Sequence, residues 1–565
     1  MTSSTPFLSL QEPHAETLRE DTARRLEALA DPEVLIIGGG VNGVATLREL
    51  ALNGVSCVLL DTGDFCTGAS GASSRMAHGG LRYLEGREFR LVAESARERN
   101  RLVAHAGHLV KPLEIVVPIE HRLRGFGRAV LRFLGLSKRS GPMSLLALEG
   151  GLLVYEIFGR REHPLPSHRT FLRRSGFPQG LRDTTRAVTS YFDGQITQPE
   201  GLVMEMLREA LDQGPQVAAL NHVSWQAEGG AITLRDRFGT GSWTLRPRVI
   251  VNATGAWIDQ VNAELGGNTR YLRGIKGAHL VLHNPKLFKR MAGRAFYFDD
   301  GTGRMVITLP VDRNVLVGTT EVETTDPDDR RVAEDEIAYL LRAMDGLFTD
   351  ISVDRSQIVS VTSGIRPLRR GVEGSATSAA RDHALEEDRF PACPAPVLSL
   401  VGGKWTTFRA FGEESADRAL ALLGRSRRVS TAARDYPGAS ACTAEELDLP
   451  QLLGKRLIDR YGALAREVAP LCREEGAVPL AGASDWCRGE IRWAIRARGA
   501  ATLEDLVLRR TRLSFGEGLR PETLEDLVTL LSQETGRDGA ELEAERRAAL
   551  RDPRLMGTRA EPASI

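Results

Sequence analysis

The first strong hydrophobic pattern along the chain is a short apolar strand that runs directly into glycines. Residues 33–40 read EVLIIGGG, residues 41–54 (VNGVATLRELALNG) follow a helical pattern that Gly54 ends, and residues 55–61 (VSCVLLD) form a second apolar run. A strand, a helix and a strand in this order predict a βαβ unit. Because parallel neighbours need such a crossover, the unit predicts a parallel sheet.

The pattern changes twice further along the chain. Short, partly alternating runs follow at 232–237 (ITLRDR), 242–255 (SWTLRPRVIVNATG), 278–283, 295–298, 304–310 and 314–320, and these predict an inserted antiparallel sheet with one covered face. After residue 435 helical spacing dominates, as in Leu524, Leu527, Val528 and Leu531. Thr502-x-x-Asp505 and Thr523-x-x-Asp526 are both predicted to be helix-starting capping boxes.

We therefore expect an α/β protein with a discontinuous Rossmann-like domain, an inserted α+β domain and an all-α C-terminal domain. A polar extension covers 1–31, with a short amphipathic helix in 16–30. The expected boundaries are 32–118, 186–270 and 356–434 for the Rossmann-like domain, 119–185 and 271–355 for the inserted domain, and 435–555 for the helical domain.

Composition excludes several classes of protein. The chain has 74 basic and 74 acidic residues, and this balance argues against a nucleic-acid partner. Its six cysteines form no C-x-x-C pair and lie near no histidines at metal-ligand spacing, so we expect a reducing compartment and no metal. The sequence contains neither a secretory leader pattern nor a run of about 18 apolar residues.

A glycine-rich loop between the first strand and the first helix is the clearest candidate binding site. Gly38-x-Gly40-x-x-Gly43 can bring a pyrophosphate close to the amides at a helix N-terminus. Asp61, at the end of the second strand, can bind a ribose hydroxyl, and a carboxylate there disfavours a 2′-phosphate. This motif alone does not separate NAD from FAD, and a purely structural glycine turn is the alternative.

Two further stretches favour a flavin. Residues 67–74 (TGASGASS) are nearly all small, which lets the backbone pass close to a large extended cofactor. Residues 399–409 (SLVGGKWTTFR) predict a second glycine loop before a helix, where Lys404 and the helix dipole could stabilise a reduced isoalloxazine. The alternative for this second loop is a structural turn. VNATGAW (251–257) is a third small-residue turn after a strand.

Candidate substrate residues are spread along the chain. SSRMAHGGLRYLE (73–85) places His78, Arg82 and Tyr83 around a glycine pair. Arg366 and Arg381 could bind a phosphate or carboxylate, although a surface ion pair is the ordinary role of one arginine. His279 lies in a strand of the inserted sheet, where a structural histidine is the alternative to a catalytic base.

Taken together, these motifs resemble those of the FAD-dependent, quinone-linked glycerol-3-phosphate dehydrogenases and their sister glycerophosphate oxidases, within the D-amino-acid-oxidase-like superfamily. The resemblance spans about 33–550 and is carried by IIGGGVNG (36–43), SSRMAHGGLRYLEGREFRLV (73–92), IKGAHLVL (275–282), VGTTEVE (317–323), SGIRPL (363–368), LVGGKWTTFR (400–409) and the helical tail. It implies oxidation of sn-glycerol 3-phosphate to dihydroxyacetone phosphate, with hydride transfer from C2 to flavin N5 and electrons passed to a membrane quinone.

The resemblance also implies roles for particular residues. His279 would be the base, Arg366 and Arg381 would hold the phosphate, Arg82 and Tyr83 would orient the hydroxyls, and Lys404 would lie near the flavin ring. Implied FAD contacts are Gly38, Gly40, Asn42, Gly43, Asp61, Thr67, Ser70, Ser73, Ser74, His78, Gly79, Ala253, Thr254, Gly255, Gly403, Lys404, Thr406 and Thr407.

Two stretches depart from the family pattern. TQPEGL (197–202) stands where a D-D-A-R-like run is common, and Asp299-Asp300 replaces a segment that often contains amides. Because an acidic pair close to a phosphate site would weaken phosphate binding unless it faces away, the substrate is less firmly indicated than FAD.

Residues 119–139 (IEHRLRGFGRAVLRFLGLSKR) interleave basic and apolar side chains and resemble an interfacial segment for an anionic membrane surface. Helices packed on the domain body are the alternative. We expect a cytoplasmic protein bound peripherally to the inner face of the cytoplasmic membrane. Three alternatives to this function stay open: an oxidase that passes electrons to O2 instead of quinone, an enzyme for another small hydroxy or amino substrate, and a non-catalytic flavin-binding scaffold. A homodimer is also possible.

Overall fold

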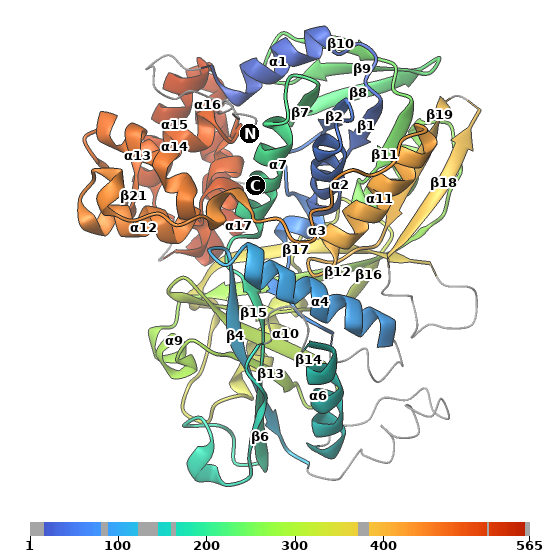
Figure 1. Ribbon diagram of the computed structural model, residues 1–565. Helices are drawn as coiled ribbons and strands as arrows, with labels where there is room; N and C mark the ends of the chain where they lie inside the picture. The colour runs from blue at the N-terminus through green and yellow to red at the C-terminus, as the bar shows by residue number, and fades with distance from the viewer. Residues whose placement is uncertain are drawn as a thin grey trace.

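The computed structural model describes residues 16–80, 89–121, 145–159, 165–370, 383–391, 393–516 and 519–559. Figure 1 shows three bodies: an α/β body around a parallel sheet, a second body around a larger sheet, and a group of C-terminal helices beside both. This arrangement confirms the predicted fold class.

The parallel sheet of the α/β body has six strands in the order β18-β19-β11-β1-β2-β7. Only β18 is antiparallel to its neighbour. The bounds are β1 (Val34–Ile37), β2 (Cys57–Leu60), β7 (Val217–Leu220), β11 (Val249–Asn252), β18 (Ala384–Phe390) and β19 (Cys393–Val401). The first four of these are buried at every position, as expected of strands covered on both faces.

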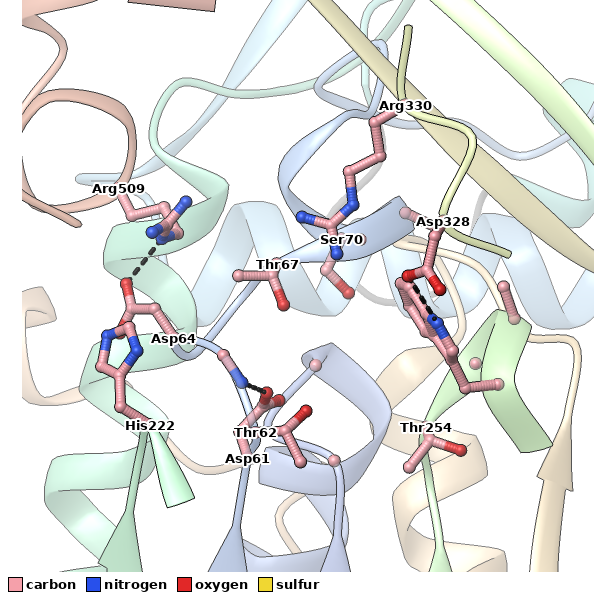
Figure 2. Close-up of a pocket in the computed structure, with 18 of the residues that line it drawn as sticks. Asp61, Thr62, Asp64, Thr67, Ser70, His222, Thr254, Asp328, Arg330 and Arg509 are labelled. Atoms are coloured by element: carbon pink, nitrogen blue, oxygen red, sulfur yellow. Dashed lines mark hydrogen bonds and ion pairs between the residues drawn. The ribbon is translucent and has the colours of Figure 1, made fainter. Parts of the chain in front are cut away.

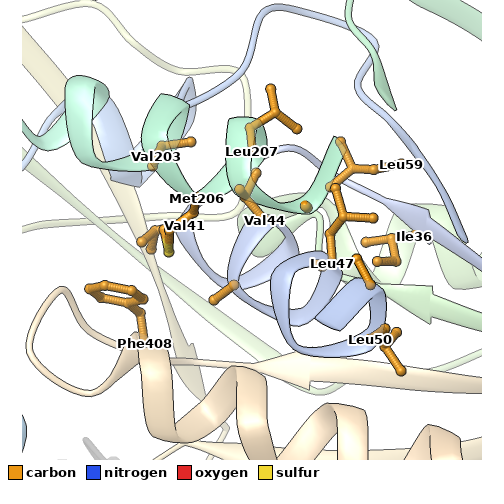
Figure 3. Close-up of a cluster of buried hydrophobic side chains, with 14 of the residues drawn as sticks. Ile36, Val41, Val44, Leu47, Leu50, Leu59, Val203, Met206, Leu207 and Phe408 are labelled. Carbon is orange, nitrogen blue, oxygen red and sulfur yellow. The ribbon is translucent and has the colours of Figure 1, made fainter. Parts of the chain in front are cut away.

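The helix α2 (Val41–Leu52) packs between α7 (Pro199–Leu211) and α11 (Phe408–Leu422). Figure 3 shows Val44 of α2 facing α7, where Leu207 lies, with Phe408 at the start of α11 nearby. Because α2 is buried between these two helices, its N-terminus has a fixed position at the carboxyl edge of the sheet. Gly54, with a φ of +72°, follows the end of α2 as predicted.

The larger sheet has ten strands and follows the order β16-β12-β15-β14-β13-β4-β6-β3, with β17 paired to β12 and β5 to β6. Its pairs are antiparallel except for β13 with β4. The bounds are β3 (Met76–Ala77), β4 (Val110–Ile119), β5 (Arg169–Phe171), β6 (Ala187–Ile196), β12 (Leu272–Leu282), β13 (Ala295–Asp299), β14 (Met305–Val311), β15 (Asn314–Gly318), β16 (Val322–Thr324) and β17 (Ile358–Arg369). Strands β4, β6 and β17 come from stretches that we assigned to the Rossmann-like domain, so the exact domain boundaries stay a prediction.

Helices cover both faces of the ten-stranded sheet. On one face α9 (Pro285–Met291) and α10 (Glu334–Asp345) pack on Leu280 and Leu282, and on the other α4 (Phe89–His105) and α6 (Leu145–Gly159) join a cluster that contains Val281. Because side chains alternate along β12, His279 lies on the face away from α10.

One sequence prediction about the strands is wrong. ITLRDR and SWTL do not join the inserted sheet but form β9 (Ala231–Asp236) and β10 (Ser242–Leu245) of a separate three-stranded sheet with β8 (Val223–Glu228), while VIVN is β11 of the parallel sheet. Four consecutive buried residues in β11 carry no alternation, which is typical of a central parallel strand. The predicted N-terminal helix is α1 (Leu18–Ala28).

The C-terminal body confirms the predicted helices. It contains α12 (Gln451–Tyr461), α13 (Ala465–Glu474), α14 (Arg488–Arg496), a π-helix (Asp505–Arg510), α15 (Pro521–Thr535), α16 (Gly539–Arg551), α17 (Pro553–Met556) and the short strands β20 (Pro479–Leu480) and β21 (Ala483–Cys487). Across the described residues, every helix is too short or too polar to cross a bilayer.

The two predicted capping boxes have different outcomes. Thr502 and Asp505 exchange side-chain-to-amide hydrogen bonds of 3.1 Å each, as a capping box requires. Thr523 and Asp526 lie inside α15 and instead bind the carbonyl and the amide of Ala481. The reason is Pro521, which takes the first position of α15, where a missing amide costs nothing.

Candidate active site

The first glycine loop brings three backbone segments so close that side chains are excluded. A Cβ on Gly43 would lie 2.0 Å from the carbonyl oxygen of Gly38. Gly38 itself has a φ of +108°, and its Cβ would lie 2.7 Å from the backbone of Ala253. Gly43 therefore allows α2 to pack on the loop, and Gly38 supplies the turn that leads into the N-terminus of α2. The amide of Val41 donates to the Ser70 hydroxyl at 3.1 Å.

Asp61 ends β2 beside this loop. Its carboxylate accepts hydrogen bonds from the amides of Gly39 (2.7 Å) and Gly63 (2.8 Å). Burial raises the pKa of Asp61, and the two amide donors oppose that shift. The carboxyl is thus held rigidly at the carboxyl edge of the sheet, where a ribose hydroxyl is expected in this fold.

Both features lie in a cavity of about 680 Å³ between the three bodies. Figure 2 shows Asp61, Thr62 and Thr67 on one part of its wall, Arg330 and Asp328 on another, and the Asp64–Arg509 ion pair beside His222. Of the predicted cofactor contacts, the cavity is lined by Gly38, Gly40, Asn42, Asp61, Thr67, Ser70, Ala253, Thr254, Gly255, Gly403 and Lys404. A glycine cradle, a helix N-terminus and a fixed carboxylate fit the phosphate and ribose groups of FAD.

The second glycine loop, more than 350 residues further along the chain, lies against the first. The amide of the Asn42 side chain donates to the carbonyl of Gly402 at 3.2 Å, and the Trp405 indole donates to the carbonyl of Ser70 at 3.0 Å. Gly402 and Gly403 both have positive φ, +84° and +100°. The two loops therefore lie in contact, and this places Lys404 on the cavity wall.

The remaining predicted cofactor residues lie beside the cavity rather than on its wall. Gly43 packs beneath the first loop, and Ser73 accepts from the amide of Arg75 at 3.2 Å. The hydroxyl of Thr406 accepts from the amide of His78 (3.0 Å) and donates to its carbonyl (3.2 Å), while Thr407 stands directly before α11 without a capping side-chain hydrogen bond. Ser74 and Gly79 contact residues of the larger sheet and its helices.

The candidate base, His279, is buried, with 1% of its surface exposed. Its Nε2 lies 2.8 Å from the Ser74 hydroxyl, and a Cβ on Gly318 would lie 2.1 Å from the imidazole ring. Burial, the Arg366 guanidinium and Arg75 together lower the pKa of His279 to about 3. The imidazole is therefore neutral at pH 7, as a proton acceptor must be.

Arg366 shares the sheet face with His279. It pairs with Ile275 in the β12–β17 ladder, its Nη2 donates to the Thr319 hydroxyl at 3.1 Å, and its Nη1 lies 3.6 Å from Glu321. The side chain keeps 36% of its surface exposed. Arg366 thus has a fixed position and solvent access on the same side of the strand pair as the buried imidazole.

Acidic side chains in the two departures from the family pattern have partners within the protein. Asp299 and Asp300 accept hydrogen bonds from the amides of their own hairpin turn, Gly301 to Arg304, and Asp300 also accepts from the Tyr339 hydroxyl. In the 197–202 stretch, Glu200 pairs with Arg75 at 3.0 Å. The carboxylates of Asp299 and Asp300 therefore already accept hydrogen bonds from the backbone of their own turn.

Other predicted residues lie outside the described part of the chain. Arg82 and Tyr83 fall in 81–88, Arg381 falls in 371–382, and most of the basic segment falls in 122–144. Their roles stay predictions.

The parts of the cavity wall that come from distant segments of the chain were not predicted from the sequence. Trp257 donates its indole N–H to Asp328 at 3.0 Å, and the Arg330 guanidinium lies 5.4 Å from the Trp257 ring centre. His222, Thr502–Asp505 and Arg509 close another part of the cavity. Trp257 belongs to the VNATGAW turn, but the sequence around the other residues carries no binding motif, so only the tertiary fold reveals them.

Asp64, His222 and Asp505 have ligand atoms within 4.8 Å of one another, a spacing that could hold a metal ion. However, Arg509 and Arg510 bind the Asp64 carboxylate at 2.6–2.7 Å, and Arg509 also binds Asp505 at 2.7 Å. With these lone pairs already used by cations, the group is a buried ion network that joins the C-terminal helices to the β2–α3 loop. Here α3 is Gly68–Gly71.

Comparison with known proteins agrees with this site. Residues 33–383 match the family of FAD dependent oxidoreductases, and residues 398–542 match the C-terminal domain of alpha-glycerophosphate oxidase. The fold and the site therefore define an FAD-dependent oxidoreductase. A glycerol-3-phosphate dehydrogenase of Synechocystis sp. is 31% identical over 86% of this chain and 89% of its own length. The chain belongs to the glycerol-3-phosphate dehydrogenase family.

Further relatives extend the comparison. Glycerol-3-phosphate dehydrogenase 1 of Mycobacterium tuberculosis is 29% identical and covers 92% of this chain and 99% of its own. D-erythritol 1-phosphate dehydrogenase of Brucella abortus is 28% identical over 86% of this chain and 95% of its own. The solved glycerol-3-phosphate dehydrogenase of Bacillus halodurans complexed with FAD shares the fold, with a TM-score of 0.72, 19% identity and coverage of 96% and 99% of the two chains.

Proposed function

We propose that this enzyme oxidises sn-glycerol 3-phosphate to dihydroxyacetone phosphate. The observation that carries the proposal is the placement of a neutral imidazole and a partly exposed guanidinium, His279 and Arg366, on one face of the β12–β17 pair. A secondary alcohol needs a proton acceptor, and a phosphate needs a fixed cation.

The chemistry divides between cofactor and protein. FAD, which the two glycine loops and Asp61 would hold, would supply an acceptor for the hydride from C2 of the substrate. His279 takes the proton of the C2 hydroxyl, because its pKa of about 3 keeps the ring unprotonated at neutral pH. Ser74, 2.8 Å from Nε2, holds the orientation of the imidazole. The alcohol thereby loses one proton and one hydride and becomes a ketone.

Arg366 would bind the phosphate group. Its guanidinium is oriented by the Thr319 hydroxyl and lies 3.6 Å from Glu321, and a guanidinium in a fixed position suits a phosphate oxygen. We propose that Lys404, on the cavity wall, stabilises negative charge near the flavin. Arg381, Arg82 and Tyr83 would complete the site as the family resemblance implies.

A second substrate is supported by one specific observation. A relative that is 28% identical over 86% of this chain is named D-erythritol 1-phosphate dehydrogenase. Erythritol phosphate has a longer polyol chain but the same pairing of a secondary alcohol with a phosphate, so the same two side chains could serve it.

We further propose that electrons pass to a membrane quinone and that the enzyme binds peripherally to the inner face of the cytoplasmic membrane. The helix α6 supports this proposal, because Leu146, Leu153 and Ile157 are 46%, 56% and 56% exposed on one side of it. An apolar stripe that follows the basic 119–139 segment in the sequence suits an anionic bilayer surface.

Rapid mixing of the oxidised holoenzyme with substrate under anaerobic conditions tests the function. Glycerol 3-phosphate should bleach the flavin absorbance, glycerol should not, and erythritol phosphate should do so only if the second substrate applies. Absence of bleaching with every phosphorylated polyol would contradict the proposal. Rapid reoxidation in air, without a response to quinone, would show an oxidase instead.

Vesicle sedimentation tests the membrane proposal. Leu153→Glu/Ile157→Glu and Arg128→Glu/Arg132→Glu should each reduce binding to anionic vesicles, whereas wild type should sediment with them. Equal sedimentation of all three proteins would place the contact elsewhere.

A further inference from the structure

A buried tyrosine in an inserted helix holds the backbone of the H-G-G stretch. The hydroxyl of Tyr155, on α6, accepts a hydrogen bond from the amide of Gly79 at 2.8 Å and one from Arg99 Nη1 at 2.6 Å. It donates its own proton to the Asp193 carboxylate. One donated and two accepted bonds are the full capacity of a phenol hydroxyl, so its orientation is fixed.

Asp193 and Arg99 complete this group. Asp193 Oδ1 accepts from the Gly79 amide at 3.2 Å and from Arg99 at 2.8 Å, in addition to the bond from Tyr155. Arg99, Tyr155 and Asp193 are each at most 3% exposed, and the pair of opposite charges is neutral overall. Burial raises the pKa of Tyr155 far above its usual value, so the hydroxyl stays a donor throughout the working pH range.

The contact with Gly79 is a close one. A Cβ on Gly79 would lie 2.4–2.7 Å from the phenol ring and hydroxyl of Tyr155. The residue is buried, and the backbone passes directly over the phenol. Glycine at this position is therefore required by the tyrosine and not only by the turn.

The backbone of His78, which precedes Gly79, is held by a different segment of the chain. His78 is bonded at both its amide and its carbonyl to the Thr406 hydroxyl, which follows Lys404 and Trp405 of the cavity wall. Two adjoining peptide groups thus have two independent anchors, one from the second glycine loop and one from α6. The α6 anchor comes from the body of the larger sheet.

We infer that Tyr155, supported by Arg99 and Asp193, is a positioning residue that sets the His78–Gly79 backbone against the second glycine loop and so fixes the flavin end of the FAD site. The inference needs FAD as the bound group but no particular substrate. It therefore survives if glycerol 3-phosphate is not oxidised, and its test uses no substrate.

The test compares holoenzymes of Tyr155→Phe, Tyr191→Phe and wild type. Tyr191 is a matched control, since it is buried and packs edge-on against Tyr155 with ring centres 6.2 Å apart. The readouts are the visible circular dichroism of bound FAD and the rate of FAD release, followed by flavin fluorescence. Tyr155→Phe should release FAD at least about tenfold faster and change the visible dichroism, whereas Tyr191→Phe should match wild type.

If Tyr155→Phe matches Tyr191→Phe in both readouts, the inference is overturned. If Tyr155→Phe does not fold, as judged by far-UV circular dichroism, Gly79→Ala breaks the same contact from the loop side. Gly79→Ala should then show the faster release and the changed dichroism, and wild-type behaviour of that variant would overturn the inference equally.

Discussion

His279 and Arg366 lie on the same face of the β12–β17 strand pair, in register positions four residues apart. His279 pairs with Thr362 and Arg366 with Ile275, and Gly277 stands between them with no side chain. A Cβ on Gly277 would lie 2.8 Å from Arg366 Nη2, so the guanidinium extends over this glycine. Burial, this nearby guanidinium and Arg75 together lower the pKa of His279 to about 3.

The buried imidazole should make folding stability depend on pH. The unfolded His279 binds a proton below pH 6.5, whereas the folded residue, with a pKa of about 3, does not. Its stabilising contribution is thus complete above pH 6.5 and declines as the pH falls toward 3, by about 1.4 kcal/mol per pH unit. The free energy of unfolding of wild type relative to His279→Gln, measured in urea, should drop by roughly 2 kcal/mol between pH 7 and 5. A difference independent of pH would contradict this.

Gly43→Ala should abolish FAD retention. The methyl would lie 2.0 Å from the Gly38 carbonyl oxygen, so α2 and the first glycine loop must separate. Gly150→Ala is a matched control, because Gly150 lies in α6 with nothing within 4 Å of its Cβ position. The ratio of 450 to 280 nm absorbance after gel filtration should be near zero for the first variant and unchanged for the second. Retention of FAD by Gly43→Ala would show that the loop is not a tight cradle.

Asp64→Asn should loosen the C-terminal helices. The carboxylate accepts from Arg509 and Arg510 at 2.6–2.7 Å in a buried setting, so its removal leaves two cations undercompensated and should cost about 3–5 kcal/mol. Asp350→Asn, which removes an exposed partner of Arg290, should lower the free energy of unfolding far less, because solvent screens an exposed pair. Urea unfolding measures both, and equal effects would mean that the network does not hold the bodies together.

The parallel-sheet core and both glycine loops were predictable from the sequence because they depend on local patterns. The apolar runs before Gly38 and Gly402 specify buried strands, and a glycine loop between strand and helix has few geometries. That the loops meet required the fold, and the Asn42–Gly402 contact shows it.

The rest depends on contacts that no local pattern encodes. His222 and Arg509 line the cavity only because the C-terminal helices dock on the β2–α3 loop. The sequence around Tyr155 does not distinguish it from any other buried tyrosine in a helix. Only the structure shows that its hydroxyl binds the amide of Gly79. The predicted capping box at Thr523 does not form because the helix begins earlier, at Pro521. Here two local signals for a helix start, a proline and a threonine, compete, and the proline determines the start.

The most direct test of the proposed site is anaerobic flavin reduction in Arg366→Ala, with glycerol 3-phosphate and glycerol compared. Arg369→Ala is the control, since Arg369 lies on the same strand but pairs with Glu386 at 2.7 Å. Loss of a charge-assisted phosphate contact costs about 3–4 kcal/mol, or about 100- to 1,000-fold in kcat/KM. We expect this loss for glycerol 3-phosphate in Arg366→Ala alone, with no flavin reduction by glycerol in any of the proteins and with the FAD content unchanged. Equal kcat/KM for glycerol 3-phosphate in Arg366→Ala and Arg369→Ala would contradict it.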